Sequence, residues 1–188
     1  MILLIRHCTP NIDYNKCNYE EALVRLYEYN TTKNIKIEEI TDIKDNIQHI
    51  VNLDKIKVLC STSPRASITA DNLFSKSVEI TRSDKFVEFD LSIFYVPFLI
   101  CSIRTWFLIS RLLWFVGILK TDRNFKQECE RADNCAKLLT REAATTDVAL
   151  VAHGLLHLFI EKRLKKMGWR RTHAFSSGCF STKVLQNA

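Results

Sequence analysis

Residues 2–10 read ILLIRHCTP, an apolar run that stops abruptly at Arg6 and His7. Four consecutive Ile and Leu residues are typical of a strand buried on both faces of a parallel sheet. Open α/β sheets bind ligands at the carboxyl ends of such strands, where Arg6 and His7 stand. A neutral imidazole is a nucleophile that can carry a phosphoryl group, and a guanidinium offers donors matched to phosphate oxygens. The pair predicts a phosphate-binding crevice; by itself, a histidine at a strand end is more often structural.

Two further buried strands are followed by side chains of the same kind. Residues 56–60 (IKVLC) precede a polar segment that ends in Arg65, and residues 147–152 (DVALVA) precede His153 and Gly154. Because the carboxyl ends of neighbouring parallel strands meet at one edge of a sheet, we expect two histidines and two arginines to lie together. These are the side chains of a phosphate pocket with a nucleophile.

The rest of the chain alternates helical and extended patterns. Apolar spacing predicts helices over residues 18–29, 41–53, 66–74, 128–142 and 155–167, with Thr41 as a possible cap of the second. Short strands are predicted at residues 78–80 and 86–89, and an edge strand at residues 179–185. Strands interleaved with helices predict a three-layer αβα sandwich, with a mostly parallel sheet covered by helices on both faces. A chain of 188 residues without a Pro/Gly/Ser-rich linker is expected to form one domain over residues 1–188.

Composition restricts the possible partners. The net charge of +6 favours anionic partners without choosing among phosphorylated metabolites, nucleic acid and membranes. The cysteines are scattered and include no CxxC motif, which fits reduced thiols in the cytoplasm better than disulfides or a zinc site. His153 and His157 have helical spacing, but no third metal ligand is suggested, and no metal is expected. The basic run over residues 162–171 is interpreted as a solvated helix end, since no nucleic-acid-binding motif accompanies it.

One apolar segment, residues 93–119, could be mistaken for a membrane span. Arg104 and Arg111 interrupt it, so no transmembrane helix is expected. The apolar residues of its second half cover most of a helix circumference, which favours a largely buried core helix over an exposed face for a partner or membrane. Residues 1–5 are too short for the apolar part of a signal peptide, so secretion is not indicated.

At its strand-end motifs the sequence resembles the histidine phosphatase superfamily, with its phosphoglycerate-mutase-like fold. The matching pieces are LIRHCT at residues 4–9, SxxxRAxxTA at residues 61–70 and VAHG at residues 151–154. The resemblance implies a metal- and cofactor-independent phosphomonoesterase acting on a phosphorylated small molecule or phosphoprotein; a mutase would need a longer chain. It implies that His7 becomes a phosphohistidine. Arg6 and Arg65 would grip the phosphoryl oxygens, and His153 would stabilise the transferring group.

The resemblance also implies a carboxylic acid that protonates the leaving oxygen. The candidates are Glu88 and Asp90 in the segment FVEFDL, and the order of features in similar proteins favours Glu88. Apolar neighbours at Phe86, Val87 and Phe89 would favour the protonated form that a general acid requires. The alternative is a solvated loop carboxylate, with Asp90 as the acid.

Two positions depart from the family pattern. Cys8 replaces the glycine that normally follows the nucleophile, and Asp13 replaces an asparagine six residues after it. Cys8 is either a redox-sensitive thiol whose pKa the nearby cations lower, or an inert buried thiol. A carboxylate at Asp13 would repel phosphate unless it points away. Both departures favour an alternative function, a catalytically silent relative that binds a phosphorylated ligand or protein partner. Specificity is expected from residues 10–50 and from a helical insertion or cap over residues 91–122.

Overall fold

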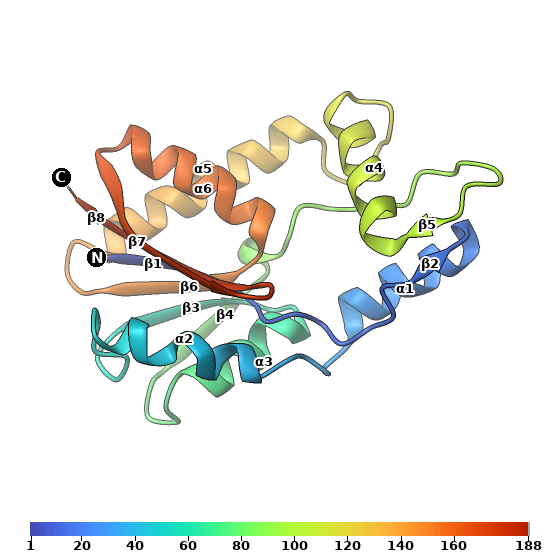
Figure 1. Ribbon diagram of the computed structural model, residues 1–188. Coiled ribbons are helices and arrows are strands. Elements are labelled where there is room, and N and C mark those ends of the chain that lie inside the picture. Colours follow the sequence, from blue (N-terminus) through green and yellow to red (C-terminus); the bar gives the residue numbers. More distant parts are fainter. Residues whose placement is uncertain (188) are drawn as a thin grey trace.

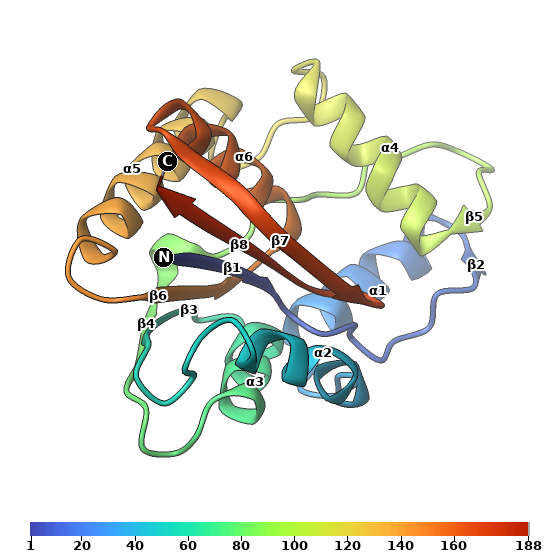
Figure 2. The ribbon, with the colours of Figure 1, turned by 60° about the vertical axis from the view of Figure 1, so that its left-hand side comes forward.

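The computed structural model describes residues 1–187. Its centre is a six-stranded sheet in the order β4-β3-β6-β1-β8-β7, shown from two sides in Figures 1 and 2. The strands are β1 Ile2–Arg6, β3 Lys57–Ser61, β4 Ile80–Ser83, β6 Val148–Ala152, β7 Trp169–Ser177 and β8 Phe180–Asn187. Strands β4, β3, β6 and β1 run parallel, whereas β8 is antiparallel to both β1 and β7. The predicted mixed α/β class with a mostly parallel sheet is confirmed.

Helices cover both faces of the sheet (Figure 1). They are α1 Tyr19–Thr31, α2 Glu38–Gln48, α3 Pro64–Leu73, α4 Ile103–Phe115, α5 Phe125–Glu142 and α6 Gly154–Lys166, with a short 3₁₀ turn η1 at Asp84–Phe86. In β1, Leu3 and Ile5 pack with residues of α2 and α3, whereas Ile2 and Leu4 pack with residues of α5 and α6. Both faces of β1 are therefore buried, which explains its unbroken apolar run.

The antiparallel side of the sheet differs from the prediction. Strand β8 lies between β1 and β7, so the predicted edge strand at residues 179–185 is an inner strand. The edge is β7, which includes the end of the basic run and whose residues are mostly exposed. Because β7 has no alternation of buried and exposed residues, it could not be recognised as a strand.

Three smaller predictions also need correction. Helix α2 begins at Glu38, so Thr41 lies inside its first turn and is not the cap. Strand β4 covers Ile80–Ser83 rather than residues 78–80. Residues 86–89 do not pair as a strand, because the Arg131 side chain donates hydrogen bonds to the carbonyl oxygens of Lys85 (2.8 Å) and Val87 (2.7 Å). At these carbonyl groups, the Arg131 guanidinium supplies the hydrogen bonds that a neighbouring strand would otherwise donate.

Helices α1 and α4 stand side by side beyond the carboxyl end of β1, together with a two-stranded ribbon (Figure 2). The ribbon pairs β2 Lys16–Cys17 with β5 Cys101–Ser102. Helix α4 buries only one face against this layer; the residues of that face are Ile103, Trp106, Ser110 and Trp114. Leu108 and Leu112 on another face are 59% and 55% exposed, so the prediction of a largely buried helix is wrong. No helix within residues 1–187 has the length and hydropathy to cross a membrane.

The turn between β7 and β8 reaches the loop that follows His7. Buried Glu39 accepts hydrogen bonds from the backbone N–H groups of Thr9 (2.9 Å) and Phe180 (3.2 Å). Gly178 in the turn has a φ of 57°, and a Cβ atom there would lie 1.9 Å from Glu39 Oε1. Only glycine fits both the backbone conformation and this close approach.

Replacing Gly178 with alanine should lower the free energy of unfolding by about 2–4 kcal/mol, because strain in the left-handed region adds to the clash with Glu39. Urea unfolding measures the loss. Gly117→Ala is the matched control, since Gly117 also has a positive φ of 78° but no atom within 4 Å of its added Cβ. Equal losses in the two variants would contradict the close approach of Glu39.

Candidate active site

The ends of β1, β3 and β6 bring the predicted phosphate-binding residues together. Arg65 donates a hydrogen bond from Nε to His7 Nε2 at 3.1 Å. Its Nη2 lies 3.4 Å from His153 Nδ1, and the rings of His7 and His153 are 5.1 Å apart. Arg6 lines the cleft beside them. One guanidinium therefore contacts both histidines at the expected edge of the sheet.

His7 is held as a neutral imidazole with a defined tautomer. Its Nδ1 lies 2.7 Å from the carbonyl oxygen of Cys8, which can only accept, so Nδ1 carries the hydrogen. Burial, aided by the positive charge of Arg65, holds the pKa of His7 well below its usual value. Nε2 therefore carries a lone pair, which accepts the hydrogen bond from Arg65. An unprotonated nitrogen beside a fixed cation is the arrangement that a phosphoryl acceptor needs.

His153 has the opposite tautomer. Arg65 can only donate, so Nδ1 of His153 accepts, and its Nε2 donates to Ser61 Oγ at 2.9 Å. Burial and the positive charge of Arg65 keep the pKa of His153 well below its usual value. His153 is thus neutral in this arrangement, and Ser61 at the end of β3 sets the orientation of its ring.

Thr69 explains why the second motif extends four residues beyond Arg65. Its hydroxyl accepts from the backbone N–H of Cys8 (3.0 Å) and donates to the carbonyl oxygen of Arg65 (2.7 Å). The side chains of Ala66 and Ala70 are fully buried, and their small size lets α3 lie close to the sheet. The motif therefore fixes Arg65 and the backbone next to His7 relative to each other.

Cys8 lies in the apolar core between the sheet and helices α2 and α3. Its side chain is fully buried, and burial raises the pKa of the thiol to about 12. The expectation of a lowered pKa at Cys8 is wrong, because burial raises the pKa and the nearby carboxylates of Glu39 and Glu38 add to that effect. The thiol is buried, as the alternative interpretation expected, and its inertness stays a prediction.

Asp13 points away from the candidate site. It forms an ion pair with Arg25 (2.5 Å) and lines a separate hollow. In place of Asp13, the end of α1 contacts the Arg65 guanidinium. Arg65 donates to the carbonyl oxygen of Tyr29 at 3.0 Å, and its Nη1 lies 3.4 Å from the amide oxygen of Asn30. The sequence held no signal for Tyr29 and Asn30, because both come from the end of an ordinary amphipathic helix.

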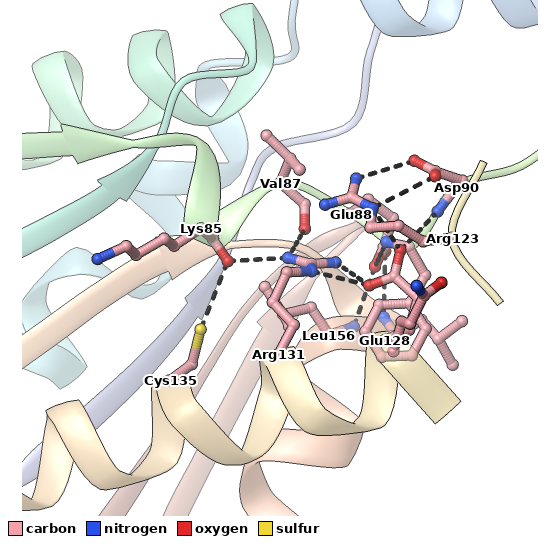
Figure 3. Close-up of polar contacts among 12 residues, drawn as sticks. Lys85, Val87, Glu88, Asp90, Arg123, Glu128, Arg131, Cys135 and Leu156 are labelled. Carbon is pink, nitrogen blue, oxygen red and sulfur yellow. Dashed lines mark hydrogen bonds and ion pairs between the residues drawn. The ribbon is translucent and has the colours of Figure 1, made fainter. Parts of the chain in front are cut away.

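Glu88 lies on the wall of the cleft at the amino terminus of α6 (Figure 3). Its carboxyl oxygens accept hydrogen bonds from the backbone N–H groups of Leu155 (3.1 Å), Leu156 (3.0 Å) and Phe89 (3.0 Å). The expectation that apolar neighbours surround this carboxyl is wrong, because Phe89 turns into the core and helix amides take its place. Asp90, the other candidate acid, forms an ion pair with Arg123 at 3.1 Å.

Guanidinium groups hold the segment that carries Glu88. The fully buried Glu128 binds Arg131, which in turn donates to the backbone of residues 85 and 87 (Figure 3). From α4, Arg111 donates to the carbonyl oxygens of Phe89 (3.0 Å) and Asp90 (2.7 Å). No role at the site was predicted for these arginines; Arg111 was noted only as a charge that interrupts an apolar segment.

Arg6 passes over the start of α6. A Cβ atom on Gly154 would lie 3.1 Å from Arg6 Nε, so the glycine of the third motif leaves space for this side chain. His157, one turn further on, is buried, and desolvation lowers its pKa to about 3. Within residues 1–187, no three His, Cys, Asp or Glu side chains gather as a metal site.

The buried histidines predict a loss of stability in acid. Burial lowers the pKa of His7, His153 and His157, so below a pH of about 6.5 the unfolded chain binds protons that the folded chain does not. The free energy of unfolding should then fall by up to about 1.4 kcal/mol per pH unit for each histidine. Urea unfolding at pH 7, 6 and 5 measures this slope. His157→Leu removes one titrating group and should reduce it, whereas a flat profile would contradict buried neutral histidines.

Comparisons with known proteins identify the fold. No protein-family model matches the sequence, and no curated protein matches it. The product of an open reading frame of Mycobacterium tuberculosis has a similar structure, with a TM-score of 0.59 and 17% identity over 86% of this chain and 78% of that chain. A phosphoserine phosphatase of Entamoeba histolytica gives a TM-score of 0.55 and 15% identity over 88% and 79%. A mycobacterial glucosyl-3-phosphoglycerate phosphatase gives 0.53 and 14% over 88% and 79%.

These similar structures belong to the histidine phosphatase superfamily. This chain has the histidine phosphatase fold. The three motifs that carried the sequence resemblance lie at the three strand ends where the histidine phosphatase fold of this chain has its cleft. At such low identity the likeness concerns the fold, and the activity must be argued from the site itself.

Proposed function

We propose that the chain is a phosphomonoesterase that works through a phosphohistidine on His7. The observation that carries the proposal is the Nε2 lone pair of His7, which the hydrogen bond from Nδ1 to Cys8 fixes beside Arg65. A phosphate bound between Arg6 and Arg65 would accept the hydrogen bond that Arg65 otherwise donates to His7. The lone pair is then free to attack phosphorus.

The proposed reaction has two balanced steps. In the first, the Nε2–P bond forms and the P–O ester bond breaks, while Glu88 gives its proton to the leaving oxygen. This step requires Glu88 in its protonated form. In the second, water attacks phosphorus, its proton returns to Glu88, and the N–P bond breaks to release inorganic phosphate and neutral His7. Arg6 and Arg65 offset the charge on the transferring group in both steps, and the neutral His153 helps to position Arg65 through its Nδ1.

The similar structures support this proposal, because several of them are named as phosphatases. They include phosphatases for phosphoserine and for glucosyl-3-phosphoglycerate, which are phosphorylated small molecules. Side chains supply each charge in the proposed reaction, so it is proposed to be independent of metals and cofactors. A phosphoprotein is the other proposed type of substrate. All the cysteines are free thiols, which supports a cytoplasmic location.

The alternative is a silent relative that binds a phosphorylated ligand without turnover. The two sequence features that favoured this alternative give it less support in the structure. Cys8 is buried in the core, and Asp13 pairs with Arg25 away from the cleft. The deciding experiment is a turnover assay that measures phosphate release from a panel of phosphomonoesters. Turnover supports the phosphatase. Tight binding of phosphate with no turnover of any ester supports the silent relative.

A further inference from the structure

The walls of the cleft beyond its phosphate-binding end are mixed, with a group of apolar side chains among polar and charged ones. The cleft has a volume of about 1160 Å³. Apolar side chains line it from α1, α4, α6 and the loop between η1 and β5; they are Leu26, Leu91, Phe107, Leu108, Leu155 and Leu158. A cleft of this volume, with apolar side chains next to a cationic centre, can hold much more than the phosphate itself.

Two of these leucines are exposed although they line a cleft. Leu108 of α4 is 59% exposed and Leu158 of α6 is 55% exposed. The apolar surface continues outward from Leu108 through Leu112, one turn along α4, and Phe115, which is 39% exposed. Phe115 in turn contacts the ring of Phe125, with centroids 5.7 Å apart. Exposed apolar surface that is continuous with a cleft indicates a bound apolar group.

Three of the five charged side chains along these walls already have a bonding partner. Arg111 donates to two backbone carbonyl oxygens of the loop that follows Glu88. Lys183 donates to Glu161 at 2.7 Å, and Asp90 forms its ion pair with Arg123. The remaining charges, Lys120 and Asp122, stand exposed at the rim in contact with water. A sugar-like or highly charged leaving group would therefore find few unoccupied partners in the cleft.

We propose that the substrate is a phosphomonoester of a long or bulky apolar alcohol, whose chain lies between Leu108 and Leu158. This inference rests on the proposed function, since the phosphate would be held by Arg6 and Arg65. Each methylene group that leaves water on binding should then tighten binding by about fourfold. The dependence should level off where the chain passes beyond the apolar surface around Leu112.

Binding of non-hydrolysable n-alkylphosphonates, from ethyl to decyl, tests this without requiring turnover. Calorimetric titration below the micelle-forming concentration should give dissociation constants that fall by about fourfold per methylene, with an increasingly negative heat-capacity change. In Leu108→Ser and Leu158→Ser, the ratio of the ethyl to the octyl dissociation constant should fall by about tenfold. Val24→Ser is the matched control, because Val24 is 58% exposed but does not line the cleft, and it should keep the ratio of the parent.

A dissociation constant that does not change with chain length would overturn the inference, even if short phosphomonoesters are hydrolysed and the proposed function stands. Tighter binding with length but no turnover of any ester would support the inference and defeat the proposed function. A second copy of the chain could instead cover these leucines. Sedimentation would then show a dimer that Leu112→Ser converts to a monomer, and that result would also overturn the inference.

Discussion

Replacing His7 with alanine should lower kcat for every phosphomonoester by about 10⁴-fold or more, because the variant has no nitrogen that can accept the phosphoryl group. This corresponds to about 5 kcal/mol or more of barrier. The fold should be largely kept, since the Arg65 guanidinium that loses its contact with His7 still has the carbonyl oxygen of Tyr29 as a partner. Inorganic phosphate should still bind, and this separates loss of chemistry from loss of the site.

The covalent intermediate can be observed directly. Brief reaction of the parent protein with a labile phosphomonoester, followed by an alkaline quench, should trap a phosphoryl group on His7 that is stable in base and lost in acid. Peptide mapping by mass spectrometry locates it. His173→Ala is the control, because His173 lies exposed on β7, far along the chain from the three motifs, and the adduct should persist in that variant. An adduct on a different residue, or unchanged turnover in His7→Ala, would defeat the mechanism.

The sequence predicted those parts of the molecule that short-range patterns determine. Strands β1, β3 and β6 are apolar because both of their faces are buried, so they could be recognised, and with them the polar residues at their carboxyl ends. Strand β7 could not be recognised, since its side chains are mostly exposed. In the same way, α4 is apolar on both its buried and its exposed face, and composition alone could not show that one of them is uncovered.

The residues of the candidate site also fall into those that local sequence patterns predict and those that they do not. Arg6, His7, Arg65 and His153 stand at strand ends and were predicted as a group. Residues that act through distant contacts were missed: Asn30 of α1 approaches Arg65, while Arg111 and Arg131 hold the segment around Glu88 from two helices. These roles depend on which helices pack over the cleft, and no pattern near any of these residues carries that information. Cys8 was ambiguous for a related reason, since only the packing of α2 and α3 decides whether its side chain enters the cleft or the core.

Glu88→Gln should separate substrates by their leaving groups. An alkoxide leaves poorly without a proton, so hydrolysis of an alkyl phosphate should slow by about 10²–10⁴-fold. Hydrolysis of p-nitrophenyl phosphate, whose leaving group departs without protonation, should slow by only about threefold or less. The nearly unchanged reaction also serves as an internal check, because it requires an intact phosphate site.

Asp90→Asn is the matched control for this experiment. Asp90 is two residues away and bound to Arg123, so its loss should loosen the loop and slow both substrates by a similar factor. Proton donation predicts a change in the ratio of the two rates, whereas a positioning effect predicts that the ratio is kept. Equal losses on both substrates in Glu88→Gln, together with a selective loss on the alkyl phosphate in Asp90→Asn, would assign the acid to Asp90. Because Glu88 faces the cleft from the amino terminus of α6 while Asp90 is held by a cation, the structure favours the selective loss in Glu88→Gln.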